Sequence, residues 1–176
     1  MATYPGAAYI PPQVYAPYVK AILDGFVRNG FRNIVIINGH GGPQTDVLNE
    51  VANQAALQHG VNTLVINWWS TCSSAALDVF GNTGGHGAEN ETAMVQAINP
   101  GLVHPEFVSR ITVTPNPPTG TWSAVPFPST VTLYEPGKGW PTDFDQQKAD
   151  EYYKQVVDCV RTLIQETLRK WERAGF

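Results

Sequence analysis

The sequence predicts an α/β domain with a mainly parallel central sheet that is flanked by helices on both faces. Two short aliphatic and β-branched runs, 34–37 and 63–66, lack a polar face, which is typical of parallel strands covered on both sides. Segments with helical spacing precede and separate these runs, and this alternation implies right-handed crossovers. A glycine-rich polar stretch, residues 38–42 (NGHGG), directly follows the first run. Ligands of such sheets bind at the carboxyl ends of the strands.

The first half of the chain is expected to form a helix, a strand, a helix and a strand. Apolar residues recur at helical spacing over Gln13–Asn29, and the next residue is a glycine that stops the helix. The strand Ile34–Ile37 follows. The helix Gln44–His59 buries one apolar face, and the strand Asn62–Asn67 comes after it. The residues expected on that buried face are Val47, Leu48, Val51, Ala52 and Ala55.

The second half is expected to be mostly helical at its two ends. A short helix lies within 71–80, and a second helix, Glu89–Ile98, is stopped by an Asn-Pro-Gly sequence. A long helix, Asp143–Arg173, carries apolar residues such as Ala149, Tyr153 and Val156 on one side. The proline-rich stretch before it predicts irregular or antiparallel pieces, at 110–114, 122–125 and 130–133. No internal repeat occurs and nothing marks a second domain.

Composition narrows the class of partner. The chain has 176 residues, which fits one domain, and 43% of them are hydrophobic, which is enough for a sizeable core. Only 15% are charged, below the roughly 25% of an average soluble protein, which suggests surface buried against other subunits. The net charge of −4 argues against nucleic acid or an anionic membrane as the main partner.

The expected location is the cytoplasm. No apolar run approaches the roughly 20 residues that span a bilayer, and the first residues have neither the basic nor the apolar region of a signal peptide. The two cysteines, Cys72 and Cys159, lie far apart in the sequence and form no CxxC motif. We therefore expect reduced thiols rather than a disulfide.

His40 and Glu91 are the strongest candidate metal ligands. Neutral imidazole and carboxylate groups are suitable donors, and His40 follows a strand directly, between glycines. Glu91 lies near the start of a predicted helix, where its carboxylate is alternatively a cap for free backbone amides. The alternative for His40 is a structural histidine bonded into the turn. A weaker interpretation makes the glycine loop an anion site at a helix N-terminus.

His86 and Glu89 are the candidate catalytic residues. His86 lies in a second glycine-rich loop, from which a histidine can act as a general acid or orient a water molecule. Glu89 is a candidate base or ligand, with helix capping or support of the site favoured. The other two histidines, His59 and His104, are expected to be structural. No P-loop, HExxH or GxSxG motif occurs, and a covalent mechanism is not supported.

The candidate substrate-binding residues are Trp68, Trp69, Gly41 and Gly42. The two tryptophans follow the second strand and therefore lie at the same edge of the sheet as the first glycine loop. Aromatic side chains there can wall a pocket for a small planar substrate, although core packing is an equal alternative. The glycines allow the backbone to approach a ligand closely.

Two of these stretches resemble motifs of the creatininase (creatinine amidohydrolase) family. Residues 31–42 look like its strand and NGHGGN loop, and residues 86–93 (HGAENETA) resemble its HAGExETS motif. Residues 4–6 and 139–142 resemble its FPGT segment and the turn before its last helix. The resemblance implies a creatininase-like α/β domain, often hexameric, that hydrolyses C–N bonds of small cyclic amides and related compounds.

The resemblance also implies a role for each matching residue. His40 matches a metal ligand, Glu91 a ligand or a partner of metal-bound water, His86 a proton donor, and Glu89 a frequent acid. The cofactor is a divalent metal, which the donor set leaves open among Zn, Mn and Fe. Pro43 stands where the family has Asn.

The family carries a further stretch before FPGT, in which a Glu, a His and a bridging Asp complete a two-metal site. We therefore expect residues 1–176 to be an N-terminally truncated creatininase-like domain whose site needs ligands from elsewhere. A homo-oligomer or a complex with an N-terminal partner chain is the expected assembly. The alternative is a non-catalytic or degenerate creatininase-like subunit that binds small molecules or a partner chain.

Overall fold

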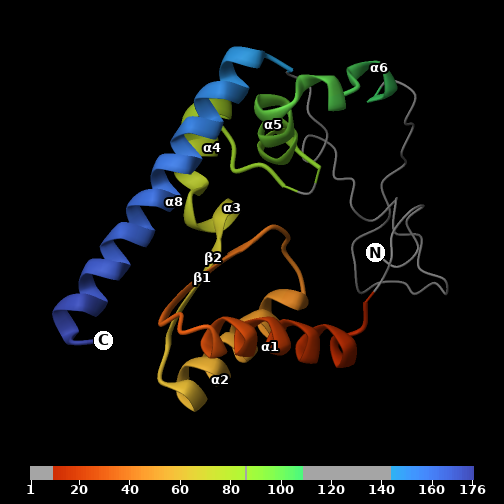
Figure 1. Cartoon of the computed structure of the whole chain (residues 1–176). Coiled ribbons are helices and arrows are strands. Elements are labelled where there is room, and N and C mark those ends of the chain that lie inside the picture. Colours follow the sequence, from red (N-terminus) through yellow and green to blue (C-terminus); the bar gives the residue numbers. More distant parts are fainter. Residues whose placement is uncertain (1–9, 86, 109–143) are drawn as a thin grey trace, which may run out of the picture. The chain divides into compact units, whose positions relative to one another are not determined.

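The computed structural model describes residues 10–85, 87–108 and 144–176, and these divide into two compact units (Figure 1). The sheet unit comprises Ile10–Cys72 and Val157–Phe176. The α5 unit comprises the described residues within Ser73–Val156.

The sheet unit is built from the first four predicted elements. They are α1 (Pro12–Arg28), β1 (Asn33–Asn38), α2 (Gln44–His59) and β2 (Asn62–Asn67). The observed bounds of α2 and β2 are the predicted ones, and those of α1 and β1 differ by one residue at each end. The alternation of helical and strand patterns was therefore a correct guide to local structure.

Glycines end both helices where the sequence predicts. Gly30 follows α1 with φ 87°, and Gly60 caps α2 with φ 63°, a left-handed conformation that costs a glycine nothing. Pro17 lies inside α1, which begins with a proline at its first turn. The helix therefore forgoes the hydrogen bond of one backbone N–H, and burial of Val19 and Leu23 offsets this loss.

The two strands pair in parallel, in a register that sets Asn33 opposite Asn62 and Asn38 opposite Asn67. Among the described residues this is the whole sheet. Side chains alternate between its faces, and α1 and α2, which lie side by side, pack on the face that carries Ile34 and Ile36 (Figure 1). The buried residues of this core are Val19, Leu23, Ile34, Leu48, Val51, Ala55 and Val61.

The segment after β2 is helical sooner than predicted. The helix expected within 71–80 is two helices, α3 (Trp68–Thr71) and α4 (Ser73–Phe80), which meet at Cys72. The predicted helix over Glu89–Ile98 is α5, and two short turns follow it: η1 (Pro100–Leu102) and α6 (Pro105–Val108). The β-prone pieces predicted within 110–133 lie outside the described residues.

The long C-terminal helix, α8 (Gln146–Ala174), begins three residues later than predicted. Asp145 explains this start, because its carboxylate accepts the backbone N–H of Gln147 at 2.8 Å as an N-cap. The predicted buried Tyr153 is wrong: Tyr152 is buried instead, on one row with Ala149 and Val156. Neither α8 nor any other helix in the described part of the chain is both long and apolar enough to cross a membrane.

The expectation of reduced thiols is wrong. Cys72, between α3 and α4, forms a disulfide with Cys159 of α8, and their Cα atoms lie 6.1 Å apart. The sequence separation of 87 hides this proximity from any local pattern. Both cysteines belong to the sheet unit, so the bond ties the C-terminal part of α8 to the end of α3.

Candidate functional site

The candidate site begins at the carboxyl edge of the sheet, where both strands end in asparagine. The glycine loop that carries His40 follows Asn38, and α3 with its two tryptophans follows Asn67. Because the strands are parallel and in register, these two segments leave the sheet side by side. The structure thus brings together the predicted loop and the predicted aromatic residues.

Asn38, the last residue of β1, holds the glycine loop through its side chain. Its side chain is buried, with 7% of its surface exposed. Its amide Nδ2 donates to Oδ1 of Asn67 at 2.8 Å and to Oγ1 of Thr45 at 3.1 Å. Its Oδ1 accepts the backbone N–H of His40 at 3.3 Å. Both ends of this amide are therefore satisfied, as a buried polar group requires.

The backbone of His40 is held on both sides. Beside the bond from its N–H to Asn38, its carbonyl accepts Nε2 of Gln44, the first residue of α2, at 2.6 Å. Gly42 permits this arrangement, because it has φ 131° and a Cβ there would lie 2.9 Å from Oε1 of Gln44. His40 itself is half-buried. These two hydrogen bonds fix the backbone from which the imidazole projects.

The aromatic residues line this loop on the side of β2. A Cβ added to Gly41 would lie 3.3 Å from Cζ2 of Trp69, so the indole packs directly against the glycine backbone. Trp68 and Trp69 meet edge to face, with centroids 6.1 Å apart, and both are half-buried. Gly41 therefore provides the space that Trp69 occupies. The substrate-binding role of these residues stays a prediction.

The second polar cluster lies in the α5 unit. Glu91, in the first turn of α5, accepts the backbone N–H of Gly87 at 2.7 Å through Oε2. The buried Asn90 accepts the backbone N–H of Gly85 at 2.9 Å. Side chains of the first helical turn thus hold the preceding loop, as in a capping box. Glu89 is the first residue of the helix, and His86 lies outside the described residues.

Tyr152 is a residue that the sequence argument missed. Only 1% of it is exposed, and its ring packs on Phe80 at a centroid distance of 5.2 Å. Burial, and secondarily the negative charge of Glu91, raises the pKa of its hydroxyl to about 12. Helical spacing from Ala149 to Val156 admits either Tyr152 or its neighbour Tyr153, so no local pattern could have identified it.

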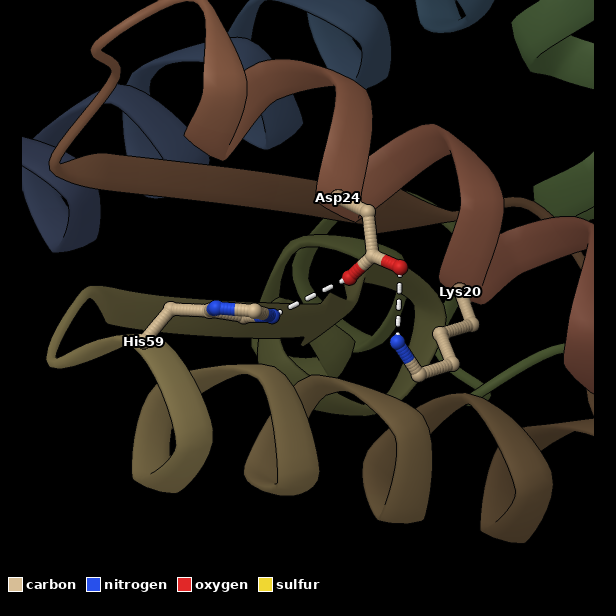
Figure 2. A network of polar contacts seen from close by, with 3 residues as sticks. All are labelled: Lys20, Asp24 and His59. Atoms are coloured by element: carbon tan, nitrogen blue, oxygen red, sulfur yellow. Dashed lines mark hydrogen bonds and ion pairs between the residues drawn. The ribbon is translucent and has the colours of Figure 1, made fainter.

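The two other described histidines make the structural contacts expected of them. Nε2 of His59, at the end of α2, lies 3.1 Å from Oδ1 of Asp24 in α1, and Oδ2 of that carboxylate accepts Nζ of Lys20 at 2.6 Å (Figure 2). The hydrogen bond from Lys20 and, less strongly, the one from His59 lower the pKa of Asp24, against a raising effect of burial. His104 lies 3.1 Å from Glu106.

The metal-ligand pair remains a prediction. His40 belongs to the sheet unit and Glu91 to the α5 unit. Within the described residues, no three side chains of the His, Cys, Asp and Glu types gather into a metal-binding group. The donor chemistry of this pair nevertheless fits a divalent cation, because imidazole and carboxylate groups both bind Zn, Mn and Fe.

Comparison with known proteins places the chain in a family. The family model described as creatininase, creatinine amidohydrolase, matches residues 1–164. One similar solved structure is a mutant creatininase complexed with creatine, with 18% identity and a TM-score of 0.67, and the match covers 94% of this chain and 68% of that one. A second mutant creatininase has 17% identity and a TM-score of 0.68 with the same coverage.

No curated protein matches the sequence. The structural likeness confirms the predicted creatininase-like α/β fold, and the family supports an amidohydrolase-type function in general. Because the family model spans nearly the whole sequence, the chain belongs to the creatininase family.

Proposed function

We propose that this protein is a metal-dependent amidohydrolase that acts on a C–N bond of a small cyclic amide or a related compound. One observation carries the proposal: at the carboxyl edge of the sheet, the backbone of His40 is fixed through both its N–H and its carbonyl, and the next residue, Gly41, packs on the ring of Trp69. Family membership supplies the general type of reaction. The edge is where sheets of this class bind ligands.

His40 and Glu91 are the residues that would hold the metal. Both groups are donors for Zn, Mn or Fe, and both belong to segments that hydrogen bonds keep in place. When bound, such a cation lowers the pKa of water and polarises a carbonyl group. In the described structure, Glu91 accepts the amide of Gly87 through Oε2, so the second carboxylate oxygen would be the one to bind a cation while that bond is kept.

His86 and Glu89 would move protons in the proposed reaction. An imidazole at position 86 is suited to protonate the leaving nitrogen when the C–N bond breaks. Glu89, at the first turn of α5, is a candidate base, and its position equally suits a capping acid that favours the helix N-terminus.

Trp68 and Trp69 would orient the substrate. Trp69 packs on the backbone of Gly41, and its edge-to-face pair with Trp68 offers an aromatic wall at the glycine loop. Such a wall favours a small planar ring over an extended peptide. We therefore propose cyclic amides of this kind as the substrate class.

Metal binding and hydrolysis test the proposal together. Zn²⁺, Mn²⁺ and Fe²⁺ affinities would be measured by competition with a chromophoric chelator, and hydrolysis of creatinine, lactams and hydantoins by product chromatography. We expect His40→Ala to weaken metal binding by about a hundredfold or more and to reduce hydrolysis to background. Glu91→Gln should act in the same direction.

His59→Ala is the matched control, because His59 binds Asp24 at the other end of the sheet and should leave both measurements unchanged. The proposal is wrong if the wild-type protein binds none of the three cations and hydrolyses none of the compounds. Hydrolysis that persists in His40→Ala would remove His40 from the mechanism.

A further inference from the structure

The two strands carry the same asparagine bridge at both ends. At the amino end, Asn62 donates through Nδ2 to Oδ1 of Asn33 at 2.8 Å. At the carboxyl end, Asn38 donates to Asn67 over the same distance. Each pair stands directly opposite in the parallel register. The protein therefore contains a built-in comparison between a bridge next to the candidate site and one away from it.

Only the carboxyl-end bridge continues into a loop. Asn38 is buried, and its amide also binds Thr45 and the backbone N–H of His40, whereas Asn33 is exposed. An amide has one acceptor and one donor end. By accepting from Nδ2, Asn67 keeps Oδ1 of Asn38 directed at His40. The orientation of the Asn38 side chain thus decides whether the N–H of His40 has its hydrogen-bond acceptor.

Asn67 also leads directly into the aromatic wall. The next two residues are Trp68 and Trp69, at the start of α3, and the ring of Trp69 packs on Gly41. The bridge therefore joins the last residue of β1, which precedes the His40 loop, to the last residue of β2, which precedes the two tryptophans.

We propose that Asn67 is a positioning residue, which orients the Asn38 amide and thereby fixes the backbone of His40 in the loop that packs on Trp69. This inference rests on the proposed function for its catalytic meaning, but the placement of His40 can be measured without any reaction. Asn67 itself touches neither metal nor substrate in this proposal. Its effect passes through Asn38 alone.

The test compares three variants by amide hydrogen exchange and by Zn²⁺ competition. Asn67→Leu removes the acceptor, and we expect exchange of the His40 backbone N–H to accelerate about tenfold, with weaker Zn²⁺ binding. Asn67→Asp keeps an oxygen that accepts from Asn38, and should retain slow exchange. Asn62→Leu breaks the matched bridge at the amino end and should leave the exchange of His40 unchanged.

Unchanged exchange of His40 in Asn67→Leu would overturn the inference, as would equal acceleration in Asn62→Leu. If Asn67→Leu does not fold, Asn67→Ser provides the same test, because its hydroxyl is too short to reach Asn38. The two proposals fail separately. Absent metal binding and hydrolysis in the wild-type protein would end the proposed function, while the exchange of His40 would still decide whether Asn67 positions it.

Discussion

At the amino end of the sheet, Asn33 and Asn62 bridge the strands, and the neighbouring helices are tied by Lys20, Asp24 and His59 (Figure 2). At the carboxyl end, the bridge between Asn38 and Asn67 is buried on the side of Asn38 and anchors a glycine loop. The amino end therefore combines an exposed amide bridge with charged surface contacts, and the carboxyl end uses a partly buried network of neutral groups. Buried amides restrain the local geometry more strongly than exposed ones. A buried amide that loses its hydrogen-bond partner incurs the full free energy of desolvation without compensation.

Removing the disulfide should have the largest effect. Cys72 directly follows α3, which leaves the carboxyl end of β2, and the disulfide ties it to Cys159 of α8. We expect Cys72→Ser with Cys159→Ser to lower the free energy of unfolding by about 2–4 kcal/mol. Urea unfolding with and without a reductant measures this.

The reductant should shift the wild-type midpoint and leave that of the double variant unchanged. Two free thiols in the unreduced wild-type protein, detected by alkylation and mass spectrometry, would contradict the assignment of the bond.

The second-largest loss of stability is expected from breaking the asparagine bridges. Asn38→Leu leaves the N–H of His40 and the oxygens of Asn67 and Thr45 without their partner, and should cost about 1–3 kcal/mol of unfolding free energy. Asn33→Leu, at the exposed end, should stay within about 0.5 kcal/mol of wild type. Urea unfolding of both variants decides this, and equal losses would show that the two ends are equivalent.

Replacing a glycine of the glycine loop by alanine should change the free energy of unfolding by a smaller amount. Gly39→Ala meets no atom within 4 Å at a backbone angle open to alanine, so reduced freedom of the unfolded chain should stabilise the protein by about 0.4–1 kcal/mol. Gly41→Ala gains the same entropy but presses on Trp69, and should lose about 1 kcal/mol relative to Gly39→Ala.

Tryptophan fluorescence should change in Gly41→Ala and not in Gly39→Ala, because only the first substitution meets the indole. The same stability in both variants would mean that Trp69 moves away without cost.

The smallest change in stability is expected at the amino end of the sheet, when the pH is lowered. Lys20 and His59 lower the pKa of Asp24 below its ordinary value of 3.8, so its carboxylate stabilises the folded state above that pH. This contribution is lost as the pH falls through the lowered pKa. Asp24→Asn should therefore be less stable than wild type at pH 6, and this difference should shrink as the pH falls toward 2.

Urea midpoints across this pH range measure the difference, and Asp46→Asn, an exposed acid in the first turn of α2, is a control. A difference in urea midpoint between Asp24→Asn and wild type that is as large at pH 2 as at pH 6 would show that Asp24 acts through packing rather than charge.

Local patterns predicted most of the described fold because they encode one element at a time. The bounds of α2, β2 and α5 follow from helical spacing, β-branched runs and stop residues such as Gly60. The same reasoning placed Tyr153 rather than Tyr152 in the core. A difference of one position changes the helix face by about 100°, and only packing against Phe80 decides between neighbouring tyrosines.

By itself, the sequence determined that a polar glycine loop ends a buried strand, that tryptophans end the next one, and that both belong to a creatininase-like α/β fold. The tertiary structure alone decided the contacts between them. The bridge from Asn38 to Asn67, the packing of Trp69 on Gly41 and the Cys72–Cys159 bond each join residues distant in the chain. Such pairings depend on strand register and helix packing, which short-range patterns of hydrophobicity do not specify.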